Sequence, residues 1–141
     1  MVTRDEIVAA ARRYIGTPFR KGGRTEKALD CVGLLILVHR DLGIPLNDST
    51  DYTFSPIANI EYIRNYVYAQ SDPAPIAPAK RGQIAIMRET AYPMHFGIIA
   101  RGPDRTTFIN ANTHERRVVE QDFATWRDKL LELREFKELV T

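Results

Sequence analysis

The sequence predicts an α+β fold, in which N-terminal helices are followed by an antiparallel sheet of about five strands. Residues 1–70 carry a helical spacing of apolar residues together with helix start and stop signals. After the proline-rich stretch SDPAPIAPAK, short runs rich in Ile, Thr and Phe alternate with turn residues, a pattern typical of strands. This order of elements indicates the α+β class. The chain has 141 residues and no internal repeat, so we expect one domain over residues 1–141.

Three helices are expected in the first half of the chain. The first covers residues 3–15, where Thr3 and Glu6 match the capping-box pattern. The second covers residues 31–42, and its side chains are apolar almost all round, which is typical of a central helix rather than a surface helix. The third covers residues 57–69.

The second half is expected to form strands joined by tight turns. GPDR at 102–105 is a turn sequence, so the strands on either side of it form an antiparallel hairpin. With this turn, Gly97 faces Asn110. A further helix is expected at 122–131. The expected strands cover 83–88, 95–100, 106–111, a short segment near 118–119, and 133–136.

The composition argues against several classes of function. The formal charge is +2, from 20 basic and 18 acidic residues that are interleaved, which provides no basic face for a nucleic acid. A single cysteine forms no internal disulfide. One cysteine and three scattered histidines are also a poor set of zinc ligands, so no metal or other cofactor is expected.

Neither a membrane span nor a signal peptide is expected. The longest apolar run, Cys31–Val38, falls far short of the roughly 20 residues needed to cross a bilayer. The N-terminus MVTRDEIVAAARR is charged and lacks the hydrophobic core of a signal peptide. We therefore expect a protein that is made in the cytoplasm and does not insert into membranes.

Cys31 is the candidate nucleophile. Asp30 is a good N-cap, so Cys31 is expected to be the first residue of the second helix. At that position backbone N–H groups and the helix dipole lower the pKa of a thiol and can hold an oxyanion. The alternative stays open, because a lone cysteine beside an apolar run is commonly a small buried hydrophobic residue.

A nucleophilic cysteine needs a base, and His95 is the best of the three histidines. It begins an expected strand and is followed by Gly97, which lets another element approach closely. His39 lies in the last turn of the second helix and is expected to be structural, whereas His114 falls in an exposed loop.

Asn110 and Asn112 are the candidates for a third catalytic residue. Both are expected on the sheet face that carries His95, because side chains alternate along each strand of the hairpin. Either amide oxygen can accept the imidazole N–H and fix the tautomer of the histidine.

Four motifs in order resemble the NlpC/P60 cysteine peptidases, a papain-like family that cuts peptide bonds in peptidoglycan stems. They are IGTPFRKGG, DCVGLL, HFGIIA and FINA. The tail end, RVVEQDFATWRDKLLELREF, also resembles the small members without a signal peptide that occur in phage tail gene clusters and gene transfer agents. The resemblance implies the NlpC/P60 fold, with the cysteine helix packed on the antiparallel sheet.

The resemblance also assigns a Cys-His-Asn triad. Cys31 would be the nucleophile and His95 the general base and then acid. Asn110, rather than Asn112, matches the position of the orienting residue.

The residues that the resemblance places against substrate are Phe19, Arg20, Asp30 and Val32. Phe19 replaces the tyrosine of the family, so its hydroxyl contact is missing, and Val32 replaces a common serine. Gln83 stands where the family commonly has aspartate. Arg20, or its neighbours Lys21 and Arg24, could bind a carboxylate of the stem peptide.

The expected function is hydrolysis of a peptidoglycan stem peptide through a thioester acyl-enzyme. The expected place of action is the cell wall, reached in a phage-like particle whose tail-tip proteins would be partners. The main alternative is a structural tail-assembly protein that keeps the fold with little or no hydrolase activity.

Overall fold

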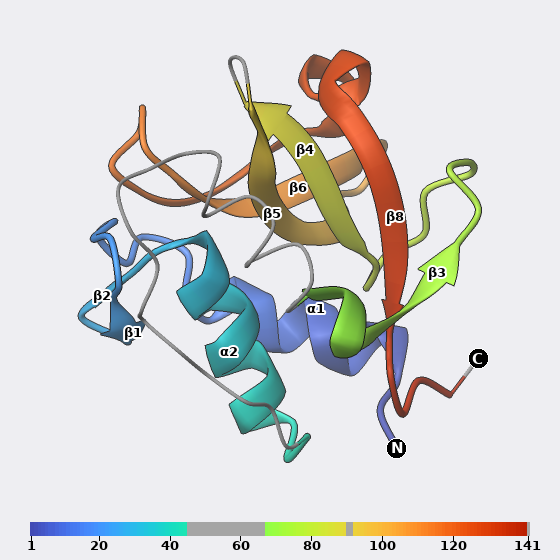
Figure 1. The fold of residues 1–141 in the computed structure, drawn as a ribbon, viewed down its shortest axis with the longest axis horizontal. Helices are drawn as coiled ribbons and strands as arrows, with labels where there is room; N and C mark the ends of the chain where they lie inside the picture. The colour runs from blue at the N-terminus through green and yellow to red at the C-terminus, as the bar shows by residue number, and fades with distance from the viewer. Residues whose placement is uncertain (45–66, 90–91, 141) are drawn as a thin grey trace.

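A computed structural model describes residues 1–44, 67–89 and 92–140. Two helices, α1 and α2, pack against a six-stranded antiparallel sheet whose strand order is β3-β8-β4-β5-β6-β7 (Figure 1). The two chain ends lie side by side, because Val2 pairs with Leu139. The elements are α1 (Arg4–Arg12), β1 (Arg24–Thr25), β2 (Ala28–Leu29), α2 (Cys31–Asp41), β3 (Ser71–Ala74), β4 (Ile84–Glu89), β5 (Tyr92–Arg101), β6 (Thr106–Asn112), β7 (Arg117–Asp122), η1 (Phe123–Thr125), η2 (Arg127–Lys129) and β8 (Leu130–Phe136).

The start of α1 is the predicted capping box. The Thr3 hydroxyl accepts from the Glu6 N–H at 3.1 Å, and the Glu6 carboxylate accepts from the Thr3 N–H at 3.0 Å. The helix ends at Arg12, three residues before the predicted end. Gly16 then adopts a φ of +94°, which glycine tolerates without strain.

The main core lies between the helices and one face of the sheet. In α2 every residue from Val32 to His39 is buried, so the predicted central position of this helix is confirmed. Its apolar side chains join those of α1 and of alternate residues on the central strands. The strand residues on this face include Ile84, Ile86, Phe96, Ile98, Ala100, Ile109, Ala111, Val118 and Phe136.

A second, smaller core covers the opposite face of the sheet. It contains Ala85, Met87, Ile99, Phe108, Phe123, Trp126 and Leu133. Phe123 and Trp126 belong to the segment that joins β7 to β8. This segment therefore closes the face that the two helices leave open.

The prediction of a helix at 122–131 is wrong. The segment forms two short 3-10 turns, η1 and η2, and β8 already begins at Leu130. Phe123 and Trp126 are three residues apart, which places both on one side of a helix with three residues per turn. The Asp122 side chain accepts from the Ala124 N–H at 2.9 Å and fixes the first turn.

The sheet has six strands, whereas about five were predicted, because part of the proline-rich stretch pairs with β8. Ser71–Ala74 forms the edge strand β3 along β8. Pro73 is compatible with this position, since an edge strand has one side that needs no N–H donor. Of the helix predicted at 57–69, residues 57–66 lie outside the described residues, and 67–69 are helical.

The predicted hairpin register is confirmed. Arg101 pairs with Thr106 and Gly97 pairs with Asn110 across β5 and β6. A Cβ on Gly97 would lie 2.4 Å from the Ile109 carbonyl oxygen and 2.5 Å from the Phe108 ring, so only glycine fits there.

Candidate active site

The start of α2 is held by a network centred on the Asp30 carboxylate. Oδ1 accepts from the Gly33 N–H at 2.7 Å and from Arg24 Nη1 at 2.9 Å. Oδ2 accepts from the Gly22 N–H at 2.8 Å. Asp30 is 4% exposed. The N-cap that the sequence predicts therefore also ties the glycine loop to the helix.

Gly23 in this loop and Gly33 in the first turn of α2 allow backbone to lie directly on backbone. A Cβ on Gly33 would come within 2.2 Å of the Gly23 carbonyl oxygen, and a Cβ on Gly23 within 2.6 Å of the Ala28 oxygen. A side chain at Gly33 would push the loop off the helix, and a side chain at Gly23 would push it off β2. The close backbone contacts at Gly23 and Gly33 thus fix the position of Cys31, which opens α2.

Cys31 is the first residue of α2 and is half-buried. It packs against the main apolar core, which includes Phe96 and Ala111. These two are the direct chain neighbours of His95 and Asn110, and α2 as a whole packs against β5 and β6. The helix that begins at Cys31 therefore rests on the two strands that carry the other predicted catalytic residues.

A backbone path also connects the helix start to the end of the sheet. The Leu29 N–H donates to the Pro18 oxygen at 3.0 Å, and the Phe19 N–H donates to the Arg116 oxygen at 2.9 Å. Pro18 is bridged to Arg117 at the start of β7. Residues 17–20 thus lie between β2 and β7.

His95 and Asn110 are in direct contact. His95 Nε2 lies 2.8 Å from Asn110 Oδ1, and both residues are almost fully buried. Trp126 stacks on the imidazole, with 5.1 Å between ring centroids and 23° between planes. Phe108 meets the imidazole edge-on at 5.9 Å. The imidazole ring is therefore held on several sides.

Asn112 lies beside this pair, and its Nδ2 donates to Asn110 Oδ1 at 3.1 Å. Asn110 is thus the amide in contact with His95, and Asn112 donates to the same oxygen atom, Asn110 Oδ1. Sequence reasoning missed Gln121, whose Oε1 accepts from both asparagines. Gln121 pairs with Phe108 on β6, which places it on the same sheet face as the two asparagines. The residues of the β6–β7 turn could have indicated which residues of β7 share this face.

The four residues expected to contact substrate differ in accessibility. Arg20 is exposed and Phe19 is half-buried against the main core. Val32 is buried among the core side chains, and the Asp30 carboxylate is engaged by donors of the chain itself. Arg24 forms an ion pair with Asp30, so its guanidinium already has a carboxylate partner.

The other two histidines occupy different environments. His39 is 2% exposed, its Nδ1 lies 2.7 Å from the Leu35 oxygen, and its ring stacks on Phe136. Burial lowers the pKa of His39 below its ordinary value, because desolvation disfavours the imidazolium. His114 is exposed in the β6–β7 turn, as predicted. Within residues 1–44, 67–89 and 92–140, no three His, Cys, Asp or Glu residues gather in a group that could hold a metal ion.

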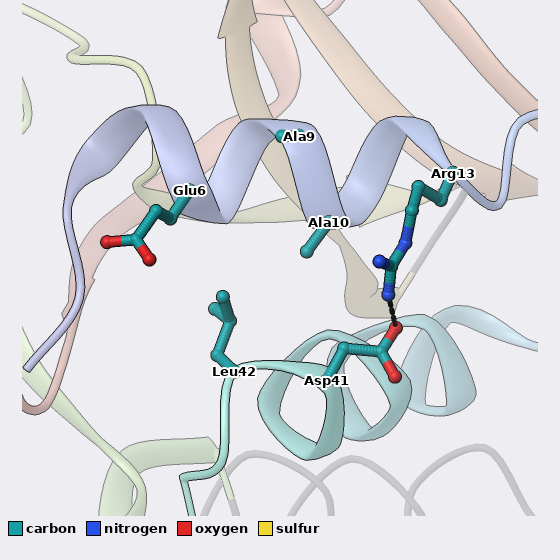
Figure 2. A pocket seen from close by; sticks show the side chains of 6 residues that line it. All are labelled: Glu6, Ala9, Ala10, Arg13, Asp41 and Leu42. Atoms are coloured by element: carbon teal, nitrogen blue, oxygen red, sulfur yellow. Dashed lines mark hydrogen bonds and ion pairs between the residues drawn. The ribbon is translucent and has the colours of Figure 1, made fainter.

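A hollow of about 220 Å³ lies between α1 and the C-terminal end of α2 (Figure 2). Ala10 and Leu42 form its apolar walls, and Arg13 pairs with Asp41 at its edge at 2.7 Å. Asp41 lies ten positions after Cys31, which is about 15 Å along a helix. The hollow is therefore at the opposite end of α2 from Cys31.

None of the helices in the described part of the chain is long and apolar enough to cross a membrane.

Several solved structures share this fold. The NlpC/p60 domain of the peptidoglycan hydrolase SagA is similar over 96% of this chain and 100% of that domain, with a TM-score of 0.69 and 20% identity. A Staphylococcus aureus protein of the NLP/P60 family, described as similar to a lipoprotein, has a TM-score of 0.67 and 21% identity. That match covers 94% of this chain but 41% of the Staphylococcus aureus chain, so this chain corresponds to less than half of that protein.

An N-acetylmuramoyl-L-alanine amidase from Bacteroides uniformis is a more distant structural relative. Its TM-score is 0.59 at 11% identity, over 93% of this chain and 96% of the amidase. No curated protein sequence is a significant match to the chain. The sequence model of the NlpC/P60 family, however, matches residues 16–135. This match covers the start of α2 and all strands of the six-stranded sheet but the end of β8. The chain belongs to the NlpC/P60 family.

Proposed function

We propose that this protein is a cell-wall hydrolase, a cysteine peptidase that cuts peptidoglycan stem peptides with Cys31, His95 and Asn110. The observation that carries the proposal is the 2.8 Å contact between His95 Nε2 and Asn110 Oδ1, in a family member whose α2 begins at the chain's only cysteine. This contact occupies one imidazole nitrogen and leaves Nδ1 as the nitrogen that would exchange a proton with the thiol.

The proposed first step forms an acyl-enzyme. The Cys31 thiol gives its proton to His95, and the sulfur attacks the carbonyl carbon of the scissile amide. Backbone N–H groups at the start of α2 would stabilise the oxyanion, supported by the positive end of the helix dipole. The C–N bond then breaks, and His95 protonates the leaving amine. The product is a thioester between Cys31 and the acyl part of the substrate.

The second step is hydrolysis of this thioester. His95 takes a proton from a water molecule, whose oxygen attacks the thioester carbonyl. The carbon–sulfur bond breaks, the carboxylic acid leaves, and the proton on His95 returns to the Cys31 sulfur. Water is therefore the only co-substrate, and the thiol and the neutral imidazole are regenerated.

The printed descriptions of two relatives support the proposed class of substrate. SagA is described as a peptidoglycan hydrolase, and the Bacteroides uniformis relative as an amidase acting at N-acetylmuramoyl-L-alanine. Both descriptions name peptidoglycan chemistry. Arg20 is exposed on the loop that precedes α2, and none of the described residues pairs with its guanidinium. It is the cation of this loop that we propose for a stem-peptide carboxylate.

The route to the wall that we propose is a phage-like tail. The support is the resemblance of the C-terminal segment and the four motifs to small tail-associated members of the family. The test is co-purification of the protein with tail-tip proteins in intact particles from the source strain.

The activity test is digestion of purified peptidoglycan by the wild type and by Cys31→Ala, with fragments identified by mass spectrometry. New stem-peptide fragments from the wild type alone are expected, and their masses identify the bond. No fragments from either folded protein would contradict the proposal.

A structural tail-assembly role is the second candidate, and Phe19 is the observation that favours it. The residue is half-buried against the core and lacks the hydroxyl that the family places toward substrate. Iodoacetamide separates the two candidates, because an activated Cys31 is alkylated rapidly at neutral pH and a purely structural one slowly.

A further inference from the structure

The side-chain amides around His95 form a chain of hydrogen bonds, and this chain begins at a group that can only donate. The Trp126 indole N–H is a donor and never an acceptor. It lies 2.9 Å from Gln121, and the partner atom is Oε1. Because the Trp126 N–H can only donate, the oxygen of the Gln121 amide, and not its nitrogen, faces the indole.

The same oxygen orients Asn110. Gln121 Oε1 accepts from Asn110 Nδ2 at 2.9 Å, so the Asn110 amide must turn its oxygen the other way, toward His95. The Phe108 carbonyl oxygen, which can only accept, also lies 3.4 Å from Asn110 Nδ2. Two acceptors thus face the nitrogen side of this amide.

A second, independent chain reaches the same orientation. The Glu115 backbone N–H can only donate, and it donates to Asn112 Oδ1 at 2.9 Å. The nitrogen of Asn112 therefore faces Asn110, where it donates to Oδ1 at 3.1 Å. Starting from Trp126 or from Glu115, the atom that lies against His95 is an oxygen.

From these contacts we infer that Gln121, held by the Trp126 indole, is a positioning residue that fixes the tautomer of His95. An amide oxygen opposite Nε2 requires the proton to be on Nε2, which leaves the lone pair of the neutral ring on Nδ1. Reversing the Gln121 amide would place its nitrogen against three donors at once, those of Trp126, Asn110 and Asn112. The catalytic meaning of this tautomer rests on the function proposed above, but its structural origin does not.

Gln121 is suited to this role by its place in the sheet. It pairs with Phe108 across β6 and β7 and is therefore diagonal to Asn110 on the same face. One oxygen accepts from three side chains, since Asn112 Nδ2 also lies within 3.4 Å. A residue that only filled space at this position would not need an acceptor.

The first test is the tautomer itself, measured by long-range proton–nitrogen NMR on protein with 15N-labelled histidine. The measurement uses Cys31→Ala, so that no thiolate–imidazolium pair complicates the spectrum, and a His95→Gln spectrum assigns the signal. The expected result is a neutral ring with its proton on Nε2, slow to exchange with water. A proton on Nδ1 in this unmodified network would overturn the inference.

The second test removes the acceptor. In Gln121→Leu the new side chain is similar in size to glutamine but has no oxygen, whereas in Gln121→Glu the new side chain keeps acceptor atoms. In Gln121→Leu the His95 ring is expected to show both tautomers or fast exchange of the Nε2 proton, and Gln121→Glu should restore the single tautomer. Gln70→Leu, the same change before the opposite edge strand, serves as the control and should leave the signal unchanged.

The third test uses the thiol. With Cys31 present, the rate constant of iodoacetamide alkylation at neutral pH is expected to fall about tenfold or more in Gln121→Leu, with a changed pH profile. A loss of folded protein alone would lower the amplitude of the kinetic phase of the folded protein and leave the pH profile of its rate constant unchanged. If Gln121→Leu does not fold, Trp126→Phe removes the indole N–H but keeps an aromatic ring on His95, and a partial loss of the single tautomer is expected.

The two proposals fail separately. A single Nε2 tautomer that depends on residue 121, in a protein that releases no peptidoglycan fragments, supports the positioning role and contradicts the proposed function. A folded Gln121→Leu with the wild-type tautomer and alkylation profile overturns the positioning role, whatever the protein hydrolyses.

Discussion

Arg24 and Asp30 form an ion pair of 2.9 Å directly before the helix that Cys31 opens, with 14% and 6% of their side chains exposed. The same carboxylate caps α2 through the Gly33 N–H and holds the glycine loop through the Gly22 N–H. Removing one partner of such a pair leaves a charge that is buried and uncompensated.

Arg24→Ala is therefore expected to destabilise the protein by about 3–5 kcal/mol, measured by denaturant unfolding. Asp30→Ala should cost at least as much, because the N-cap is lost in addition, which is worth about 1 kcal/mol. The control is Arg20→Ala, on the same loop but exposed, for which less than about 0.5 kcal/mol is expected. Equal effects of Arg20→Ala and Arg24→Ala would contradict this account.

The sequence could predict the parts of the fold whose signals are local. The capping box of Thr3, the N-cap of Asp30 and the turn after Arg101 each depend on a few adjacent residues. The turn alone set the pairing of Gly97 with Asn110, and with it the shared face of His95 and Asn110.

The parts that could not be predicted depend on residues far apart in the chain. Gln83 stands in place of the family aspartate, and its Nε2 donates to Glu135 at 2.8 Å, while Arg4 also binds Glu135. A carboxylate at residue 83 would face Glu135, so glutamine fits this partner. Likewise, nothing in the local sequence indicates that the Trp126 N–H meets Gln121.

Gly33 offers a steric prediction. A Cβ at Gly33 would lie 2.2 Å from the Gly23 carbonyl oxygen, and backbone cannot move aside as a flexible side chain can. Gly33→Ala is expected to destabilise the protein by roughly 3 kcal/mol, the upper part of the range for overpacking, and to slow Cys31 alkylation. Both are measurable on one preparation, by denaturant unfolding and by iodoacetamide kinetics.

Gly102→Ala is the matched control for this change. The nearest atoms to a Cβ at Gly102 are 3.6 Å away, which is an ordinary contact distance. Its expected effect is within about 1 kcal/mol. A stable Gly33→Ala with rapid alkylation would show that the loop does not rest on the helix as described.

His39 makes stability depend on pH. Burial lowers the pKa of its imidazole in the folded state, while the unfolded chain keeps the ordinary value of 6.5. The unfolded state therefore binds more protons below pH 6.5, and the free energy of unfolding falls as pH decreases from 6.5 toward the lower folded-state pKa. Among the described residues its Nε2 has no hydrogen-bond partner, so protonation there gains none.

His39→Phe keeps an aromatic ring against Phe136 but has no proton to bind. Thermal or denaturant unfolding between pH 7.5 and 5 is expected to lose stability more steeply in the wild type than in this variant. The comparison of the two proteins isolates His39, because the other histidines are common to both. Parallel pH curves would contradict the assigned pKa direction.

Asn110 and Asn112 make different contacts beside the imidazole of His95. Asn110 Oδ1 lies 2.8 Å from His95 Nε2, whereas Asn112 Nδ2 donates to that same oxygen. Asn110→Ala removes the acceptor and is expected to lower kcat/KM for stem-peptide release by roughly 10²-fold or more. Asn112→Ala leaves that acceptor in place and should cost less than about tenfold, which is the size of one supporting hydrogen bond. Fragment release followed by mass spectrometry measures both. A larger loss in Asn112→Ala would reverse the assignment of the third catalytic residue, because the amide that touches the imidazole would then matter less than the amide that donates to it.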